Sequence, residues 1–273
     1  MRKLLKTDLL RVFKDKLFLI SCIIAGAFAF ISPLLYKAIF AFMGADEELL
    51  TMMGAMPTAK SMLFQAFLPG GDLGLILPVL IIIAISKDFS YGTIRNKIIA
   101  GHSRAQIFLS MLITSVLVMC SLMLSYALLT FAISLIFFEY SYVAFSIAEL
   151  GYLIISILFE LLVYVTICTI MCFFCVFMKN TGTSVVMYLA TNFLVTIVGS
   201  IIMVAFALAD PEKRGVYTIL EILNNTNIFT STLIGSGTSY TFKEIAYILA
   251  PNLIFSALFI LLGIVIFKKK DLK

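Results

Sequence analysis

The chain has 273 residues, of which 62% are hydrophobic and 13% charged, and its formal net charge is +5. Soluble domains have about 45–50% apolar and about 25% charged residues, so this composition excludes a soluble enzyme, a nucleic-acid-binding module and a disordered tail. Long uncharged runs, such as Ala105 to Phe138, predict an all-α polytopic membrane protein, because about 20 apolar residues suffice for one helical crossing.

Residues 1–16 predict a helix that lies along the membrane surface. Leu5, Leu9, Val12 and Phe13 fall on one helical face, and basic residues occupy much of the rest. This pattern is typical of an interfacial helix whose apolar face is toward lipid and whose basic face is toward the headgroups. An unstructured basic tail is the alternative interpretation.

Hydropathy predicts six membrane-spanning helices within a single transmembrane domain over residues 1–273. The predicted spans cover residues 17–36, 70–86, 105–138, 150–178, 184–208 and 245–267. The second span is short and contains Gly74 and Pro78. The third is longer than one perpendicular crossing needs, so we expect it to be tilted and to project beyond the bilayer.

The basic residues predict the side of the membrane on which the chain ends. Six spans place both termini on the same side, and fifteen of the twenty Lys and Arg residues fall on that side. The positive-inside rule assigns this side to the cytoplasm. The net charge therefore indicates topology, and we expect its partner to be the anionic inner leaflet rather than a nucleic acid.

The loop at residues 87–104 predicts a short helix between the second and third spans. Gly92 can break the incoming helix, Thr93 can cap a new one and Gly101 can end it. These signals leave a helix of about two turns.

This short helix is predicted to have an apolar and a polar side. The apolar side is formed by Ile94, Ile98 and Ile99, and the side chains expected to lie away from it are Arg95, Asn96 and Lys97. A helix of this kind, fixed to two membrane spans, suits docking into a groove on a cytosolic partner. A solvated basic turn at the lipid headgroups is the alternative.

Small and hydroxyl-bearing side chains predict faces for close contact between helices in the membrane. In the third span they are Ser110, Thr114, Ser121 and Ser125, and in the fifth they are Thr191, Asn192, Thr196 and Gly199. Because six helices with so few inward polar groups make a poor enclosed channel, we expect a translocation path to need a second subunit.

Glu160 is an ionisable residue well inside the fourth span. It lies in line with Ser156 and Tyr164, one helical turn away on either side. Intramembrane carboxyl groups are candidates for ion or substrate pathways. The alternative is a structural carboxyl group that reaches water or a neighbouring hydroxyl, and the sequence leaves both interpretations open.

Several kinds of chemistry lack the residues that they need. The chain has one histidine, His102, and no phosphate-binding G-x-x-x-x-G-K-[ST] motif. Its five cysteines all lie in apolar spans, which argues against a disulfide framework and favours a packing role over a metal site. We therefore expect no metal, no cofactor and no enzymatic activity in this chain.

The order of these elements resembles the permease subunits of ABC-2-type transporters. The motif that carries the resemblance reads Asp88-x-x-x-Gly92-Thr93-Ile94-Arg95 and continues through Gly101-x-Ser103-Arg104. It is most similar to the small peptide- and bacteriocin-handling exporters of Gram-positive bacteria, among them exporters of amphipathic peptide toxins. The acidic position is often Glu in that family, whereas here it is Asp88.

The resemblance implies a function and a set of partners. Two cytosolic ATPase subunits, which would bind ATP and Mg, would drive a permease dimer in the plasma membrane that exports amphipathic or hydrophobic peptides. The implied ATPase-coupling residues are Asp88, Gly92, Thr93, Ile94, Arg95, Lys97, Ile98 and Ile99. The outer segment 209–244 would form short re-entrant helices, one over residues 212–223 and an apolar piece over residues 228–235.

Two other functions remain open from the residues alone. One is an ion-coupled secondary transporter that uses Glu160. The other is a membrane sensor or immunity protein that sequesters a peptide without transporting it.

Overall fold

The computed structural model describes residues 1–43, 58–67, 73–138, 146–178, 180–210, 214–227 and 240–270. Within these ranges every regular element is an α-helix. Five of the helices are long and apolar enough to cross a membrane on their own, and a bent pair of helices brings the number to six if it counts as one span. The predicted all-α polytopic membrane class is confirmed.

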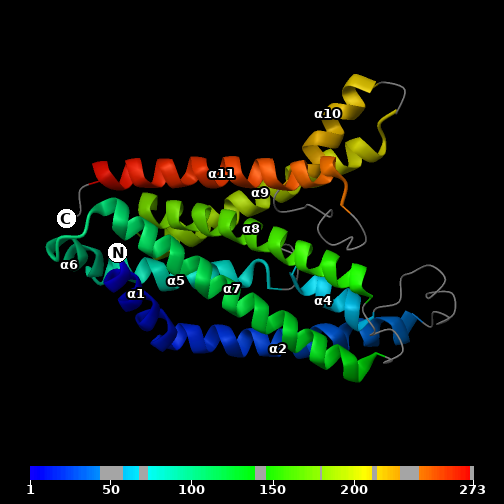
Figure 1. The fold of residues 1–273 in the computed structure, drawn as a ribbon, viewed down its shortest axis with the longest axis horizontal. Helices are drawn as coiled ribbons and strands as arrows, with labels where there is room; N and C mark the ends of the chain where they lie inside the picture. Colours follow the sequence, from blue (N-terminus) through cyan, green and yellow to red (C-terminus); the bar gives the residue numbers. More distant parts are fainter. Residues whose placement is uncertain are drawn as a thin grey trace.

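The longer helices run along the bundle (Figure 1). They are α2 (Lys16–Met43), α5 (Ile76–Ser90), α7 (Arg104–Phe137), α8 (Ile147–Met178), α9 (Thr181–Ala207) and α11 (Phe242–Lys269). The bent pair consists of α5 and α6 (Thr93–Ile99), whose axes differ in direction by 58°. The second predicted span, 70–86, differs most from its helix, because residues 73–75 form a turn and α5 continues to Ser90.

Three shorter helices complete the described structure. They are α1 (Arg2–Lys14), α4 (Ala59–Phe67) and α10 (Arg214–Asn225). The first agrees with the predicted N-terminal helix, and α10 agrees with the outer helix predicted over residues 212–223. α4 has no counterpart among the helices predicted from the sequence. The apolar piece predicted over residues 228–235 lies outside the described residues.

Several long helices begin at residues that cap them. Ser103 accepts a hydrogen bond from the Gln106 backbone N–H, and the Gln106 side chain accepts one from the Ser103 N–H, which closes a capping box at the start of α7. Thr241 and Glu244 form the same arrangement at the start of α11. These caps fix where α7 and α11 begin, because they satisfy backbone donors that the helix itself leaves unpaired.

The two ends of the bundle carry different elements. α1, α6 and the end of α11 lie at one end together with both chain termini, and α10 projects at the other end (Figure 1). We call the first the basic end, because it holds the Lys and Arg residues of α1, of residues 87–104 and of residues 268–270, and the second the distal end. An even number of crossings accounts for both termini at one end. That the basic end faces the cytoplasm stays a prediction.

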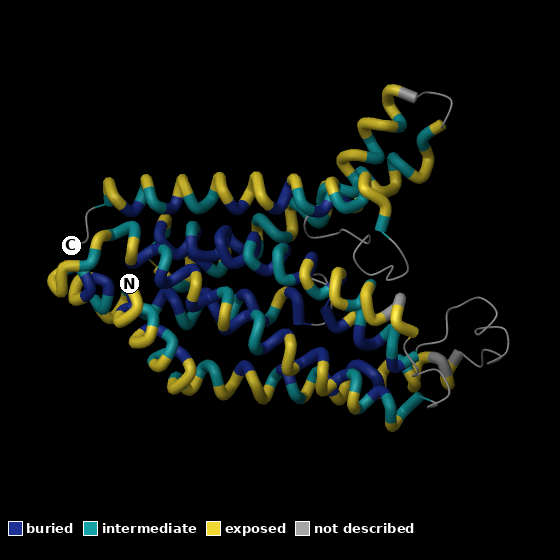
Figure 2. The backbone as a smooth tube through the Cα atoms, viewed as in Figure 1, coloured by how far each residue is buried: buried dark blue, intermediate teal, exposed yellow. Residues whose placement is uncertain are grey.

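α7 and α8 form the centre of the bundle. Of their most apolar stretches, 61% and 67% of the residues are buried, compared with 6% for α9. The outward faces of α2 and α11 are exposed along most of their length (Figure 2) and consist mainly of large apolar side chains. Lipid tails are as apolar as these side chains, so a bilayer accommodates such faces without a protein partner.

Candidate functional site

α6 is set at an angle to α5 by two glycines in left-handed backbone conformations. Gly92 has a φ of 68° and is the N-cap of α6, and Gly101, with a φ of 85°, follows its C-cap. Residues with a Cβ rarely adopt such angles, so glycine is needed at both positions. The predicted short helix is confirmed. The capping role assigned to Thr93 is wrong, because Thr93 is the first residue of the helix.

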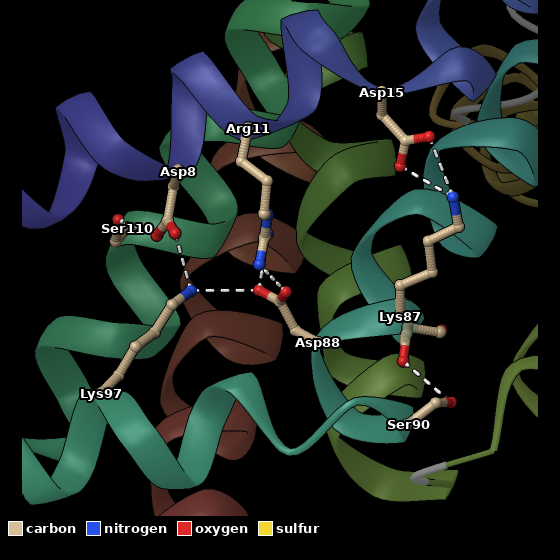
Figure 3. A network of polar contacts seen from close by, with 9 residues as sticks. Asp8, Arg11, Asp15, Lys87, Asp88, Ser90, Lys97 and Ser110 are labelled. Carbon is tan, nitrogen blue, oxygen red and sulfur yellow. Dashed lines mark hydrogen bonds and ion pairs between the residues drawn. The ribbon is translucent and has the colours of Figure 1, made fainter.

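A network of ion pairs joins α6 to α1 and α5, and a hydrogen bond extends it to α7 (Figure 3). The Arg11 guanidinium of α1 donates to both carboxylate oxygens of Asp88 at the end of α5, with 2.7 Å from Nη2 to Oδ2. The Lys97 ammonium of α6 lies 3.0 Å from Asp88 Oδ2 and 2.7 Å from Asp8 Oδ1 of α1. The Ser110 hydroxyl of α7 donates to Asp8 Oδ2 at 2.7 Å. A continuous chain of contacts therefore links α1, α5, α6 and α7.

The network is buried and its charges balance. Asp8, Asp88 and Lys97 are all less than a tenth exposed, whereas the Arg11 side chain is more accessible. Burial lowers the pKa of Lys97 from its ordinary value, although the hydrogen bond and charge of Asp8 oppose this shift. Two carboxylates and two cations alternate, so each buried charge has an opposite charge beside it. Removal of any one of these charged groups leaves the charges beside it uncompensated.

A second, more exposed ion pair fixes the turn between α1 and α2. Lys87 Nζ lies 2.7 Å from Asp15 Oδ2 and the Leu17 backbone N–H donates to Asp15 Oδ1 at 3.1 Å. Burial of Asp15 works against its ionisation, but the hydrogen bonds from Lys87 and Leu17 outweigh it, and the pKa of Asp15 is lowered. This pair ties the start of α2 to the last turns of α5.

Two cations at the basic end bind the last carbonyl groups of long helices. Arg104 donates to the backbone oxygens of Phe267, Lys268 and Lys270 at 2.9, 2.9 and 2.6 Å. The Lys270 ammonium donates to the Val176 oxygen at the end of α8 at 2.7 Å. Cations at helix C-termini satisfy unpaired carbonyls and interact favourably with the helix dipole, so the first residue of α7 is held to the end of α11.

The predicted ATPase-coupling residues of α6 do not share one surface. Ile94 is 2% exposed and belongs to the core of the bundle, and Ile98 is half-buried against it. Lys97, expected to lie away from the apolar side, instead points inward; the reason is that Asp8 and Asp88 lie beneath it. Ile99, at 76% exposed, points outward.

The outward side of α6 is therefore composed differently from the prediction. Four side chains at the α5–α6 turn and on α6 are exposed: Tyr91, Arg95, Asn96 and Ile99. We call them the outer face of α6. It combines two large apolar groups with a cation and an amide, and its backbone is held from behind by the buried network.

α1 has an inward and an outward apolar side. Leu4, Asp8 and Val12 are buried against the bundle, so the predicted placement of Val12 on the lipid-facing side is wrong. Leu10 and Phe13 are exposed, and Leu5 and Leu9 are half-buried beside them. This outward side is flanked by Arg2 and Lys6, which line a shallow open groove with the four apolar residues.

The predicted helix-contact residues divide between buried and outward positions. Ser110, Thr114 and Gly199 are buried, Ser121, Thr191, Asn192 and Thr196 are half-buried, and Ser125 is exposed. Ser121 and Ser125 donate to carbonyl oxygens of their own helix, those of Val118 and Leu122. The two ends of the predicted α7 face thus differ: the part near the basic end contacts α1, and the rest points away from the core.

Glu160 lies inside the bundle, 1% exposed, and neither of its carboxyl oxygens has a hydrogen-bond partner among the residues that the structure describes. Ser156 and Tyr164, its neighbours one turn away on α8, are also buried. In the part of the chain that the structure describes, no three His, Cys, Asp or Glu residues form a group that could hold a metal ion.

Sequence reasoning missed Asp8 and Arg11 as partners of the coupling segment. A signal for Asp8 is present in the sequence, because it occupies the same helical face as Leu4 and Val12, where an acidic residue needs a partner. Arg11 carries no such signal, since the residue that it binds is 77 positions away along the chain.

Comparisons with known proteins place this bundle in a family. The chain is similar to the "Uncharacterized membrane protein YdbK" of Bacillus subtilis (strain 168), with 30% identity over 135 residues, which are 50% of this chain and 51% of the relative. The chain thus matches about half the length of that curated relative. A family model described as "Protein of unknown function (DUF2705)" matches residues 18–273, from the start of α2 to the end of the chain. This multi-pass membrane protein therefore belongs to the DUF2705 family.

Proposed function

We propose that the chain is the membrane-spanning permease subunit of an ATP-driven ABC-2-type exporter, and that it works with a separate ATPase chain. The observation that carries the proposal is the anchored position of α6. A short helix at the basic end is tied by Lys97 to carboxylates of α1 and α5, while Tyr91 and Ile99 stay exposed. An ATPase that docks on the outer face of α6 would bind a rigid element of the permease.

The buried ion-pair network would allow α6 to transmit movement to its neighbouring helices. The Asp88–Lys97 contact joins α6 to the helix before it, and the Asp8–Ser110 contact joins the same network to the helix after it. Only residues 100–103 separate α6 from α7. A displacement of α6 would therefore move α5 and α7 together, because buried charge-assisted hydrogen bonds resist separation.

The proposal includes an orientation, a cellular location and a lipid contact. The basic end would face the cytoplasm, and the membrane would be the plasma membrane of a Gram-positive bacterium. The outward apolar side of α1, with Leu10 and Phe13 exposed beside Arg2 and Lys6, would lie in the inner leaflet interface, where basic side chains meet anionic headgroups.

The path would form between two permease subunits. α9 is the least buried of the five long spans, and Thr191 and Thr196 are half-buried on it, so this helix offers a surface for a second copy or a homologue. Peptides of amphipathic or hydrophobic character are the proposed cargo. Two observations support this cargo class: the segment from Asp88 to Arg104 resembles that of peptide exporters, and the spans contain few charged residues.

The coupling role predicts that Ile99→Asp weakens ATPase binding by about tenfold or more, since a carboxylate buried without a partner costs at least about 1.4 kcal/mol, one factor of ten. The measurement is co-purification of the ATP-hydrolysing partner with the tagged full chain from native membranes. Leu208→Asp is the matched control, because Leu208 is as exposed as Ile99 but lies at the end of α9 toward the distal end. Equal recovery of the ATPase with both variants would contradict docking on α6.

The cargo class predicts that amphipathic peptides stimulate ATP hydrolysis by the reconstituted complex, whereas sugars do not. The reason is that an apolar path with few charges offers little to a hydrophilic solute that must lose its water. ATPase rates are measured against a panel of peptides, lipids and sugars, followed by an export assay on each compound that stimulates. Stimulation confined to sugars would refute the cargo class. Flux driven by a proton gradient in vesicles without any ATPase would favour the ion-coupled carrier instead.

A further inference from the structure

Glu160 is an acidic side chain isolated inside the bundle. Both of its oxygens are buried and have no hydrogen-bond partner in the described residues. The ion pairs found among the described residues lie elsewhere, four at the basic end and one between Lys243 and Glu221 toward the distal end. An ionised carboxylate without a partner in an apolar interior costs several kcal/mol, far more than the neutral acid does.

The hydroxyl groups nearest along α8 are engaged with other partners. Tyr164 donates to the backbone oxygen of Phe67 in α4 at 2.9 Å. Ser156 shares a hydrogen bond of 2.5 Å with the Tyr240 hydroxyl, from the segment before α11. Neither group turns toward Glu160, although each lies one helical turn from it. Neither of these two hydroxyl groups therefore donates to the Glu160 carboxyl group.

Within the described part of the chain, the titratable groups around Glu160 carry no compensating charge. Those nearest to it are phenols and thiols: Tyr164 and Tyr240, and next to Tyr164 the side chains of Cys120, Tyr126 and Tyr188. Among the described residues of the adjoining helices, Lys243 pairs with Glu221, and Glu244 accepts a hydrogen bond from Thr241. Lys60 of α4 also has an interaction partner, and the charged residues of α5, of α7 and of the end of α11 lie at the basic end. A proton is the smallest cation that neutralises a carboxyl group in such a space.

We infer that Glu160 is a proton-binding site: it holds its proton while the bundle is closed and releases it to water when the distal half opens. In the release step the carboxyl O–H bond breaks, the proton passes to a water molecule, and the remaining carboxylate is stabilised by the water that has entered. This inference goes beyond the proposed function, since it requires neither an ATPase nor a particular cargo.

The contact between Ser156 and Tyr240 is the closure through which water would enter. Ser156 lies one turn from Glu160 toward the distal end, and Tyr240 is half-buried and packs edge-on against Phe159, with ring centroids 5.3 Å apart. Thr241, the next residue, is exposed. Separation of this pair would connect the carboxyl group to the aqueous side at the distal end.

Infrared spectroscopy of the purified full chain in nanodiscs tests the inference. At neutral pH the wild-type spectrum should contain the C=O stretch of a protonated carboxyl group, shifted in D₂O, and Glu160→Gln should lose it. Glu244→Gln is the matched control, because Glu244 lies at the start of α11, is only partly buried, and accepts hydrogen bonds from the Thr241 backbone N–H and hydroxyl. This variant should keep the band.

A second variant tests the closure. Tyr240→Phe retains the ring that packs on Phe159 but removes the hydroxyl contact with Ser156, so the band should disappear at a lower pH than in the wild type. If Glu160→Gln does not fold, Glu160→Asp should keep the band at a changed frequency. Two results would overturn the inference. One is that the spectrum of the wild type minus that of Glu160→Gln, at neutral pH, contains the bands of an ionised carboxylate. The other is that the C=O band has the same frequency in Glu160→Asp as in the wild type.

Discussion

Lys97→Met should lower the free energy of unfolding by about 3–5 kcal/mol, the range observed when one partner of a buried ion pair is removed. Methionine retains an unbranched apolar stem of similar length, so the substitution removes the charge with little change in packing. It leaves Asp8 with the Ser110 hydroxyl and Asp88 with Arg11, and it takes away the cation that separates two buried carboxylates. Denaturant unfolding of the purified chain in micelles, followed by circular dichroism, measures the loss.

The same substitution at Lys87 is the control. Lys87 pairs with Asp15 at 2.7 Å, but both side chains are about a quarter to a third exposed, and exposed pairs contribute roughly 0.2–1 kcal/mol. Adding Asp8→Asn to Lys97→Met should restore part of the lost stability, because it removes one of the uncompensated charges. Equal losses from Lys97→Met and Lys87→Met would show that the buried network does not stabilise the bundle.

The network also explains which parts of the site were predictable. The glycines Gly92 and Gly101 are local signals, and they predicted the position of α6 correctly. The orientation of Lys97 could not be predicted from the loop alone, because a basic residue on a short surface helix ordinarily points to water. It points inward because Asp8 of α1 and Asp88 of α5 lie within reach of its ammonium group (Figure 3), and the contact with Asp8 joins residues far apart in the chain.

The spans were predictable for a different reason. A stretch of apolar residues long enough to cross a bilayer must be helical there, since lipid offers no partners for its backbone groups, and the helices follow from hydropathy alone. α4 escaped prediction because its nine residues include Lys60 and Gln65, which keep it below the length and apolarity of a span. Its burial depends on α7, against which it packs, and such a tertiary contact leaves no periodic signal.

The surroundings of Glu160 were likewise only partly predictable from the sequence. Its place in a span was predictable, because it is a charged residue type within an apolar run. Its lack of partners was not, because Ser156 and Tyr164 lie where either could have bonded it. Their hydrogen bonds go instead to Tyr240 and to the Phe67 backbone, on segments whose positions depend on the fold of the whole chain.

The close contact between α7 and α11 predicts the second large effect, at Gly263. A Cβ added there would lie 2.5 Å from Cζ of Phe108, a ring that is fully buried. Gly263→Ala should therefore cost about 1–3 kcal/mol of stability, the usual penalty for overpacking, although alanine in place of glycine inside a helix ordinarily adds about 0.5–1 kcal/mol. The measurement compares the unfolding of Gly263→Ala with that of Gly26→Ala in detergent micelles. The methyl group added at Gly26 meets nothing within 4 Å, so this control shows the helix-propensity gain without the overpacking penalty.

Because this contact lies near the basic end, overpacking at Gly263 should also affect the contacts of Arg104. Gly263 lies one turn before Phe267, and Phe108 lies one turn after Arg104, which donates to the Phe267 carbonyl. A methyl group that pushes the two helices apart should thus also weaken the Arg104 cap on α11. Phe108→Leu combined with Gly263→Ala should recover most of the loss, because the shorter side chain leaves room for the methyl group. If Gly263→Ala proves as stable as Gly26→Ala, the two helices can separate without cost, and the Arg104 contacts do not hold α7 to α11.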